Sequence, residues 1–198
     1  MILKRNPWIG IADLLSSVVL VLLLLFIMAS IGPKYTQEAQ RQDMMQQINT
    51  ALNDYESKGQ IRIHRDKGIL EFTSVTFPSG SAQLNENTEP MIKDLALRLK
   101  QYMTEHSSME ILIEGHTDPD VVSEVMNRGG YFADNIQLST LRAANVRSAL
   151  LNYLGKEYAN RIGVAGYGDT RLKNTADPLS AENRRIEIRI LWNGKDDK

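Results

Sequence analysis

The most prominent hydrophobic pattern is an unbroken apolar stretch close to the N-terminus. From Leu14 to Ile31 the sequence has no charged residue, and the surrounding segment reads WIGIADLLSSVVLVLLLLFIMASIGP. A bilayer core requires about 20 mostly apolar residues in a helix. Residues 1–33 are therefore predicted to form an N-terminal tail and a transmembrane helix. Within this helix Asp13, Ser16 and Ser17 stand at i, i+3 and i+4, so they share one face.

A second, weaker pattern follows in residues 34–59, which are rich in glutamine, glutamate and asparagine. Apolar residues recur there every three or four positions, which predicts a helix with a narrow apolar stripe. They are Met44, Ile48, Ala51, Leu52 and Tyr55. We interpret this segment as a helical linker whose stripe either pairs with a second copy of the chain or lies on the following domain.

Residues 60–198 alternate between strand-like and helix-like patterns, which predicts an α+β domain. A hairpin is expected around the turn Asp66-Lys67-Gly68, and a helix is expected to begin near Thr88, with Pro90 in its first turn. The remaining predicted elements are a strand at 111–113, a helix from about 139 to 154, and strands at 162–167 and 185–192. The connection over residues 119–137 is long enough to suggest a functional role.

Composition and charge narrow the possible functions. The net charge of −1 and the pI of about 6.3 give no indication of a nucleic-acid partner. The chain has no cysteine, and its three histidines are widely separated, so no metal site or cofactor is predicted. Lys4 and Arg5 precede the apolar helix and only Lys34 follows it closely, which predicts a cytoplasmic N-terminus and an external C-terminal domain. The alternative of a cleaved signal peptide fits less well, because the apolar core is too long and contains Asp13.

Five segments of the C-terminal region form a recognisable series of motifs. They are FPSGSAQL at 77–84, IEGHTD at 113–118, NIQLSTLRAANV at 135–146, GVAGYGD at 163–169 and NRRIEIRI at 183–190. In this order they resemble the OmpA-like peptidoglycan-binding domain. The resemblance implies a β-α-β-α-β domain with two helices on one face of a sheet. It also implies a binding protein and not an enzyme.

In this family an aspartate and an arginine grip the diaminopimelate of a peptidoglycan stem peptide, and the matching residues are Asp118 and Arg142. Their charges suit a zwitterionic ligand, because a carboxylate binds its ammonium group and a guanidinium binds its carboxylate. Thr117 and Asn135 are expected to make lesser polar contacts. Arg184 and Arg185 also match the family, and strand pairing or charge balance could explain both. The loop before Asn135 is about eight residues longer than the family pattern implies.

The order of apolar helix, helical linker and OmpA-like domain resembles the B subunits of rotary stator units, in which a membrane aspartate carries the coupling ion. WIGIAD matches the start of their membrane helix, so Asp13 is the expected ion carrier. The resemblance implies an inner-membrane protein that conducts protons, as a homodimer surrounded by a multi-span A subunit. This family includes flagellar MotB subunits and the B subunits of the Zorya anti-phage system, and the short linker and Leu-rich span favour the Zorya type.

Two other functions remain open from the sequence. A passive tether between membrane and peptidoglycan would explain the domain and would leave Asp13 without a role. A hydrolase would have to use His116, Asp118 and Ser139, whose spacing matches no base and nucleophile arrangement.

Overall fold

The computed structural model describes residues 7–73, 77, 81–120 and 134–192, with the side chains of residues 7, 9, 30–37 and 192 excepted. The chain divides into two compact units, Met1–Gln40 and Arg41–Lys198.

The first unit contains most of helix α1, which runs from Pro7 to Ser57. Its segment Gly10–Ala29 has a mean hydropathy of 2.8 and none of it is buried inside the protein, so its length and composition suffice to cross a membrane. The Ser16 hydroxyl donates to the Ala12 carbonyl at 2.8 Å, and the Ser17 hydroxyl donates to the Leu14 carbonyl at 2.8 Å. Both hydroxyls are thus satisfied within the helix, as an apolar solvent requires.

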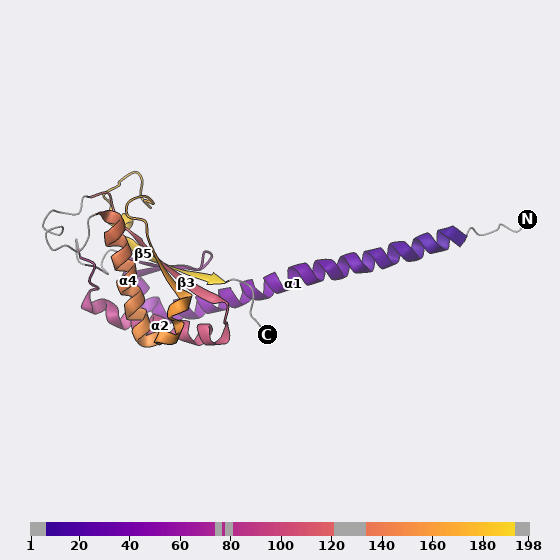
Figure 1. The fold of residues 1–198 in the computed structure, drawn as a ribbon, viewed down its shortest axis with the longest axis horizontal. Helices are drawn as coiled ribbons and strands as arrows, with labels where there is room; N and C mark the ends of the chain where they lie inside the picture. Colours follow the sequence, from indigo (N-terminus) through magenta and orange to yellow (C-terminus); the bar gives the residue numbers. More distant parts are fainter. Residues whose placement is uncertain (1–6, 74–76, 78–80, 121–133, 193–198) are drawn as a thin grey trace, which may run out of the picture. The chain divides into compact units, whose positions relative to one another are not determined.

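The second unit is built on a mixed sheet of five strands in the order β1-β2-β5-β3-β4 (Figure 1). All neighbouring strands are antiparallel except β3 and β4, which are parallel. The strands are β1 (Ile61–His64), β2 (Ile69–Phe72), β3 (Met109–His116), β4 (Ile162–Gly166) and β5 (Arg185–Trp192). Because β1 and β2 are joined by a tight turn, Gly68 adopts a φ of +65°, as the predicted hairpin required.

Strand register places apolar residues on one face of this sheet and charged residues on the other. Ile113 of β3 lies opposite Ile188 of β5, and Leu70 of β2 lies opposite Ile188 from the other side. All three side chains are fully buried. One residue along, Glu114, Glu187 and Glu71 stand opposite one another on the second face. The apolar face forms the core with the helices.

Two helices, α2 (Glu89–Glu105) and α4 (Asn135–Leu154), pack on the apolar face and on each other (Figure 1). Helix α2 has Pro90 in its first turn, as the sequence predicted. Helix α4 begins four residues before the predicted Ser139, because the Asp134 side chain accepts a hydrogen bond from the Gln137 amide at 2.8 Å and so caps the helix at Asn135. Its end at Gly155 agrees with the prediction.

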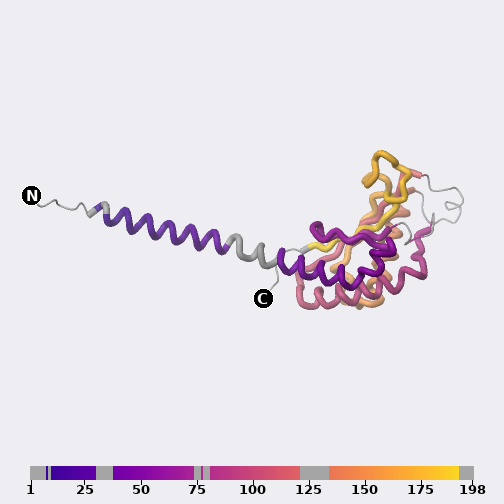
Figure 2. The backbone as a smooth tube through the Cα atoms, turned by 180° about the vertical axis from the view of Figure 1, so that it is seen from behind, coloured from indigo at the N-terminus to yellow at the C-terminus, as the bar shows by residue number. Residues whose placement is uncertain are grey.

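The C-terminal part of α1 belongs to this same core, and Figure 2 shows it beside the domain's other helices. Met44, Met45, Ile48 and Leu52 have no exposed surface. The Tyr55 hydroxyl donates to Asp94 of α2 at 2.9 Å. Of the two alternatives for the apolar stripe in 34–59, the structure therefore shows the one in which the stripe lies on the following domain.

The predicted α+β fold is confirmed, with α2 and α4 on one face of the sheet and the end of α1 beside them. Strand β3 is longer than the predicted 111–113, since alternate residues of its charged face do not look apolar in the sequence. Most of the predicted loop 119–137, the flank with Lys4 and Arg5, and part of the segment 77–84 lie outside the described residues. The division at residues 33 and 59 stays a prediction.

Candidate functional site

The candidate site lies where β3 ends, next to the first turns of α4. Two glycines allow the helix to approach the strands closely. A β-carbon at Gly115 would lie 2.1 Å from the Ser139 carbonyl oxygen, and one at Gly166 would lie 2.0 Å from the Thr140 hydroxyl oxygen. Backbone contact of this kind is possible only without a side chain. Gly115 and Gly166 thus let the ends of β3 and β4 lie against the N-terminal half of α4. Thr117 and Asp118, which follow β3, are placed beside that helix as a result.

Asp118 follows β3 and is held on two sides. Its side chain forms an ion pair with Arg184, whose Nη1 donates to Asp118 Oδ2 at 2.5 Å. Its backbone carbonyl accepts a hydrogen bond from the Asn135 side-chain amide at 3.2 Å, and the Asp120 carbonyl accepts a second from the same amide at 3.1 Å. Asn135 therefore ties the segment after β3 to the start of α4.

Arg142 projects from α4 toward the same region and is almost fully buried. Its Nε donates to the Ser81 carbonyl at 2.9 Å, and its guanidinium lies 5.3 Å from the centre of the Phe77 ring. Burial lowers the pKa of Arg142 to about 10, Asp118 opposes this shift, and Arg184 adds to it. Asp118 and Arg184 thus lie close enough to Arg142 to influence its pKa, and Arg142 stays charged at neutral pH.

Thr117 occupies the bend between β3 and Asp118. Its amide donates to the Gly168 carbonyl at 2.8 Å, which joins the ends of β3 and β4. Its hydroxyl is buried and, within the described part of the chain, has no hydrogen-bond partner. The structure therefore brings Asp118, Arg142, Thr117 and Asn135 to one end of the sheet, and their roles in binding stay predictions.

Arg184 is the residue that sequence reasoning did not assign to the site. It lies in the NRRIEIRI segment, just before β5, where strand pairing or charge balance would explain an arginine without a role in the site. Asn183 fixes its backbone: the buried Asn183 side chain accepts from the Lys173 and Asn174 amides at 2.8 Å and donates to three carbonyls, the nearest that of Pro178 at 2.8 Å. A pocket of about 180 Å³ borders Arg184 on one side.

The charged face of the sheet carries a row of carboxylates across three strands. Glu114 of β3 accepts from Arg189 at 2.7 Å, Glu187 of β5 accepts from Arg185 at 2.8 Å, and Glu71 of β2 accepts from Lys173 at 2.7 Å. Like charges placed opposite one another on a sheet are destabilising. The glutamates therefore depend on these cations, and Arg189 also contacts Glu187 at 3.4 Å.

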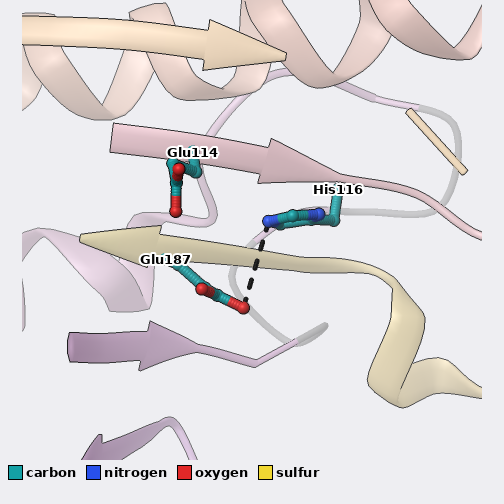
Figure 3. Close-up of side chains that lie close together, drawn as sticks. All are labelled: Glu114, His116 and Glu187. Atoms are coloured by element: carbon teal, nitrogen blue, oxygen red, sulfur yellow. Dashed lines mark ion pairs between the residues drawn. The ribbon is translucent and has the colours of Figure 1, made fainter. Parts of the chain in front are cut away.

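His116 lies beside this row and is almost fully buried (Figure 3). Its Nε2 is 3.9 Å from Glu187 Oε1, its ring stacks on Tyr167 with centroids 5.4 Å apart, and neither ring nitrogen has a hydrogen-bond partner among the described residues. Burial, assisted by Arg185, lowers the pKa of His116 to about 4. The imidazole is therefore neutral at pH 7.

Glu114, His116 and Glu187 place one potential ligand atom each within 4.8 Å of one another, which is compatible with a divalent cation on geometry alone. The surrounding charges fit a cation poorly. Arg189 and Arg185 already bond the two carboxylates, and both guanidinium groups lower the pKa of His116. The group is better explained as a charge network that stabilises the face of the sheet.

Ser139 offers no support for hydrolysis. Its hydroxyl donates to the Ile136 carbonyl at 2.9 Å and accepts from the Gly168 amide at 3.0 Å, and the residue has no exposed surface. A nucleophile needs access to substrate and a base within hydrogen-bond reach. This serine joins α4 to the turn after β4.

Residues 76–185 match the OmpA family, and the chain belongs to that family. Solved structures of MotB-type proteins share its fold. A MotB-like protein from Desulfovibrio vulgaris is 26% identical, with a TM-score of 0.58, and the match covers 79% of this chain and 96% of that one. The periplasmic domain of Helicobacter pylori MotB shares the fold at 20% identity and a TM-score of 0.51, over 63% and 76% of the two chains. The cell wall anchor of a Pseudomonas aeruginosa type VI secretion system also shares the fold, at 23% identity and a TM-score of 0.55. That match covers 73% of this chain and 96% of the other.

Two curated relatives extend the similarity at the level of sequence. The protein YtxE of Bacillus subtilis is 29% identical over 161 residues, which are 78% of this chain and 61% of that protein. Outer membrane porin F of Pseudomonas aeruginosa is 36% identical over 116 residues, or 59% of this chain and 29% of the porin. The chain thus spans less than two thirds of the length of either relative.

Proposed function

We propose that the OmpA-family domain binds peptidoglycan through the diaminopimelate of a stem peptide. Asp118 would take the ammonium group and Arg142 the carboxylate, with Thr117 and Asn135 as polar neighbours. The observation that carries this proposal is the meeting of Asp118 and Arg142 at one end of the sheet, where Asp118 opposes the lowering of the Arg142 pKa by burial. Among the described residues the buried Thr117 hydroxyl has no hydrogen-bond partner, so it is a further polar group of the site.

We further propose that the chain is the B subunit of a MotB-like stator in a bacterial inner membrane. Gly10–Ala29 would cross the bilayer once, with the N-terminus in the cytoplasm and the domain in the periplasm. Asp13 would bind and release protons next to a multi-span A subunit, and two copies of this chain would share that partner. A charge crossing 100 mV releases about 2.3 kcal/mol, which is energy enough to drive a conformational step.

Asp13 is what favours a stator over a passive tether. A carboxylate inside an apolar helix costs roughly 2.5–3.5 kcal/mol near the bilayer centre and less toward its edge. Ser16 and Ser17 satisfy their hydroxyls within the helix, so Asp13 is the polar group of that face that needs a partner or a proton. A tether gains nothing from such a residue.

For the output of the motor we propose anti-phage defence of the Zorya type, with a flagellar role as the alternative. Two features of the sequence support this proposal. The span is rich in leucine, and only a short stretch of sequence separates its end at Ala29 from the compact unit that begins at Arg41. A phage-plating assay on cells with and without the gene separates this output from swimming motility.

The wall-binding proposal is tested by sedimentation of the detergent-solubilised full chain with purified sacculi. Asp118→Asn and Arg142→Gln should each lower the affinity about tenfold to hundredfold, because each removes a charge-assisted contact of roughly 1.5–3 kcal/mol. Arg98→Gln, a change at an exposed arginine of α2, is the matched control and should bind as the parent does. Equal binding by all four proteins would remove this site from the proposal.

The stator proposal is tested by Asp13→Asn in the native operon. Asparagine keeps the size of the side chain and cannot cycle a proton, so function should be lost while a multi-span protein still copurifies. Asp13→Glu keeps the chemistry and should retain part of the activity. A chain that purifies without such a partner, and is active as Asp13→Asn, would instead be a tether.

A further inference from the structure

The ion pair between Asp118 and Arg184 has a consequence for any ligand that uses Asp118. The carboxylate that would receive an ammonium group already holds a guanidinium, with Nη1 of Arg184 2.5 Å from Oδ2. The Asp118 side chain is 10% exposed and that of Arg184 is 37% exposed, so Arg184 is the member of the pair with access to solvent. An incoming ammonium group therefore competes with Arg184.

The two arginines of the site differ in how they are held. Arg142 is fixed by the Ser81 carbonyl and the Phe77 ring and is nearly buried. The Arg184 side chain donates to Asp118 and, at 3.5 Å, to the Leu179 carbonyl, and Arg184 borders the pocket of about 180 Å³, which offers space into which the side chain can move. Its backbone, in contrast, is fixed through Asn183. Arg184 can thus release Asp118 without leaving the site.

Counting charges shows what kind of ligand gains from this exchange. Asp118, Arg142 and Arg184 together carry a net charge of +1. A ligand with an ammonium group alone replaces one cation on Asp118 with another and leaves Arg184 without an anion. A ligand whose ammonium and carboxylate groups sit on one carbon fills Asp118 and supplies a carboxylate that the released guanidinium of Arg184 shares with Arg142. Specificity of this kind arises from a penalty on the wrong ligand as much as from contacts to the right one.

We propose that Arg184 is a specificity-determining residue of this site, which selects a zwitterionic amino-acid centre over a simple amine. Arg184 pairs with Asp118 until a ligand brings both an ammonium group for Asp118 and a carboxylate for Arg184. The inference rests on the proposed function, since it concerns the same ligand. It assigns to Arg184 the discrimination between stem peptides that carry diaminopimelate and those that carry lysine, which lacks the second carboxylate.

The experiment measures the affinity of the detergent-solubilised full chain for two soluble muropeptides that differ only in having diaminopimelate or lysine at the third position. The parent should prefer the diaminopimelate form by about tenfold or more, the value of one charge-assisted contact. Arg184→Gln should reduce this preference about tenfold, mainly by strengthening binding of the lysine form, because Asp118 is then free for any ammonium group. Arg184→Lys keeps a cation on Asp118 and should retain most of the preference.

Arg62→Gln is the matched control, because Arg62 lines the same pocket and bonds Glu71 and Glu182 instead of Asp118. It should leave the preference unchanged. If Arg184→Gln lowers both affinities equally, or changes neither, Arg184 has a structural role and the inference is overturned while wall binding stands. If the parent binds neither muropeptide, the proposed function is overturned and the inference with it.

Discussion

Gly115 and Ser139 lie so close that a β-carbon on the glycine would sit 2.1 Å from the serine carbonyl oxygen. Since that oxygen belongs to the backbone of α4, it cannot move aside as a flexible side chain could. Gly115→Ala should therefore push α4 away from β3 and lower the free energy of unfolding by roughly 1–3 kcal/mol or more. Urea denaturation followed by circular dichroism measures this change.

The control for this prediction is Gly163→Ala on β4, where an added β-carbon would meet the Leu112 methyl at 3.4 Å. That distance is ordinary packing, and alanine restricts the unfolded chain, so stability should change by less than about 1 kcal/mol. Equal destabilisation by both substitutions would mean that the close approach at Gly115 is not what limits side-chain size there.

A second prediction concerns the part of α1 that packs into the domain. Met44, Met45, Ile48 and Leu52 are fully buried, and each contributes roughly 1.5–3 kcal/mol by removal from water. A fragment of residues 41–198 should unfold cooperatively, whereas residues 60–198 should lose several kcal/mol or fail to fold. The comparison uses urea midpoints and the binding of a hydrophobic dye. If the two fragments are equally stable, the helix is an accessory to the domain and not part of its core.

This helix also shows where sequence patterns were informative and where they were not. The apolar stripe in 34–59 predicted the helix, but a stripe has the same spacing whether it packs on a domain or on a second copy. The length of β3 could not be predicted for a similar reason. Glu114 and His116 are buried although they are polar, because Glu114 pairs with Arg189 and His116 stacks on Tyr167. Periodicity reports apolar burial and does not register buried charge.

The candidate site shows the same limit. Asp118 and Arg142 were predicted because they stand in motifs, and the structure places them together. The pairing of Asp118 with Arg184 joins residues far apart in the chain, and a sequence gives no distance between them. The glycines of the same motifs carried a usable signal, since a glycine at a strand end often marks the close approach of another backbone.

A third prediction concerns Asn183, whose buried side chain makes five hydrogen bonds to the turn before β5. Asn183→Asp keeps the shape and still accepts from two amides, but it cannot donate to the three carbonyls and places a charge against them. Stability should fall by roughly 1–3 kcal/mol or more. Asn53→Asp, on an exposed position of α1, is the control and should change stability little. Similar melting temperatures for both variants would contradict the assigned role of Asn183.

The last prediction concerns His116 and pH. Burial lowers its pKa in the folded protein to about 4, from an ordinary value of 6.5. As the pH falls, the unfolded chain protonates this imidazole near pH 6.5, whereas the folded protein protonates it only near pH 4. The contribution of the neutral ring to the free energy of unfolding is therefore complete above pH 6.5 and is lost as the pH falls through about 4. At about 1.4 kcal/mol for each pKa unit, the loss is about 3–4 kcal/mol at most. His116→Gln should remove that part of the pH dependence of the unfolding free energy between pH 7 and 4.

In an NMR titration of residues 41–198 the His116 ring should stay neutral down to about pH 4. A midpoint near 6.5, or an unchanged pH dependence in His116→Gln, would show that the neutral ring does not contribute to stability in this way.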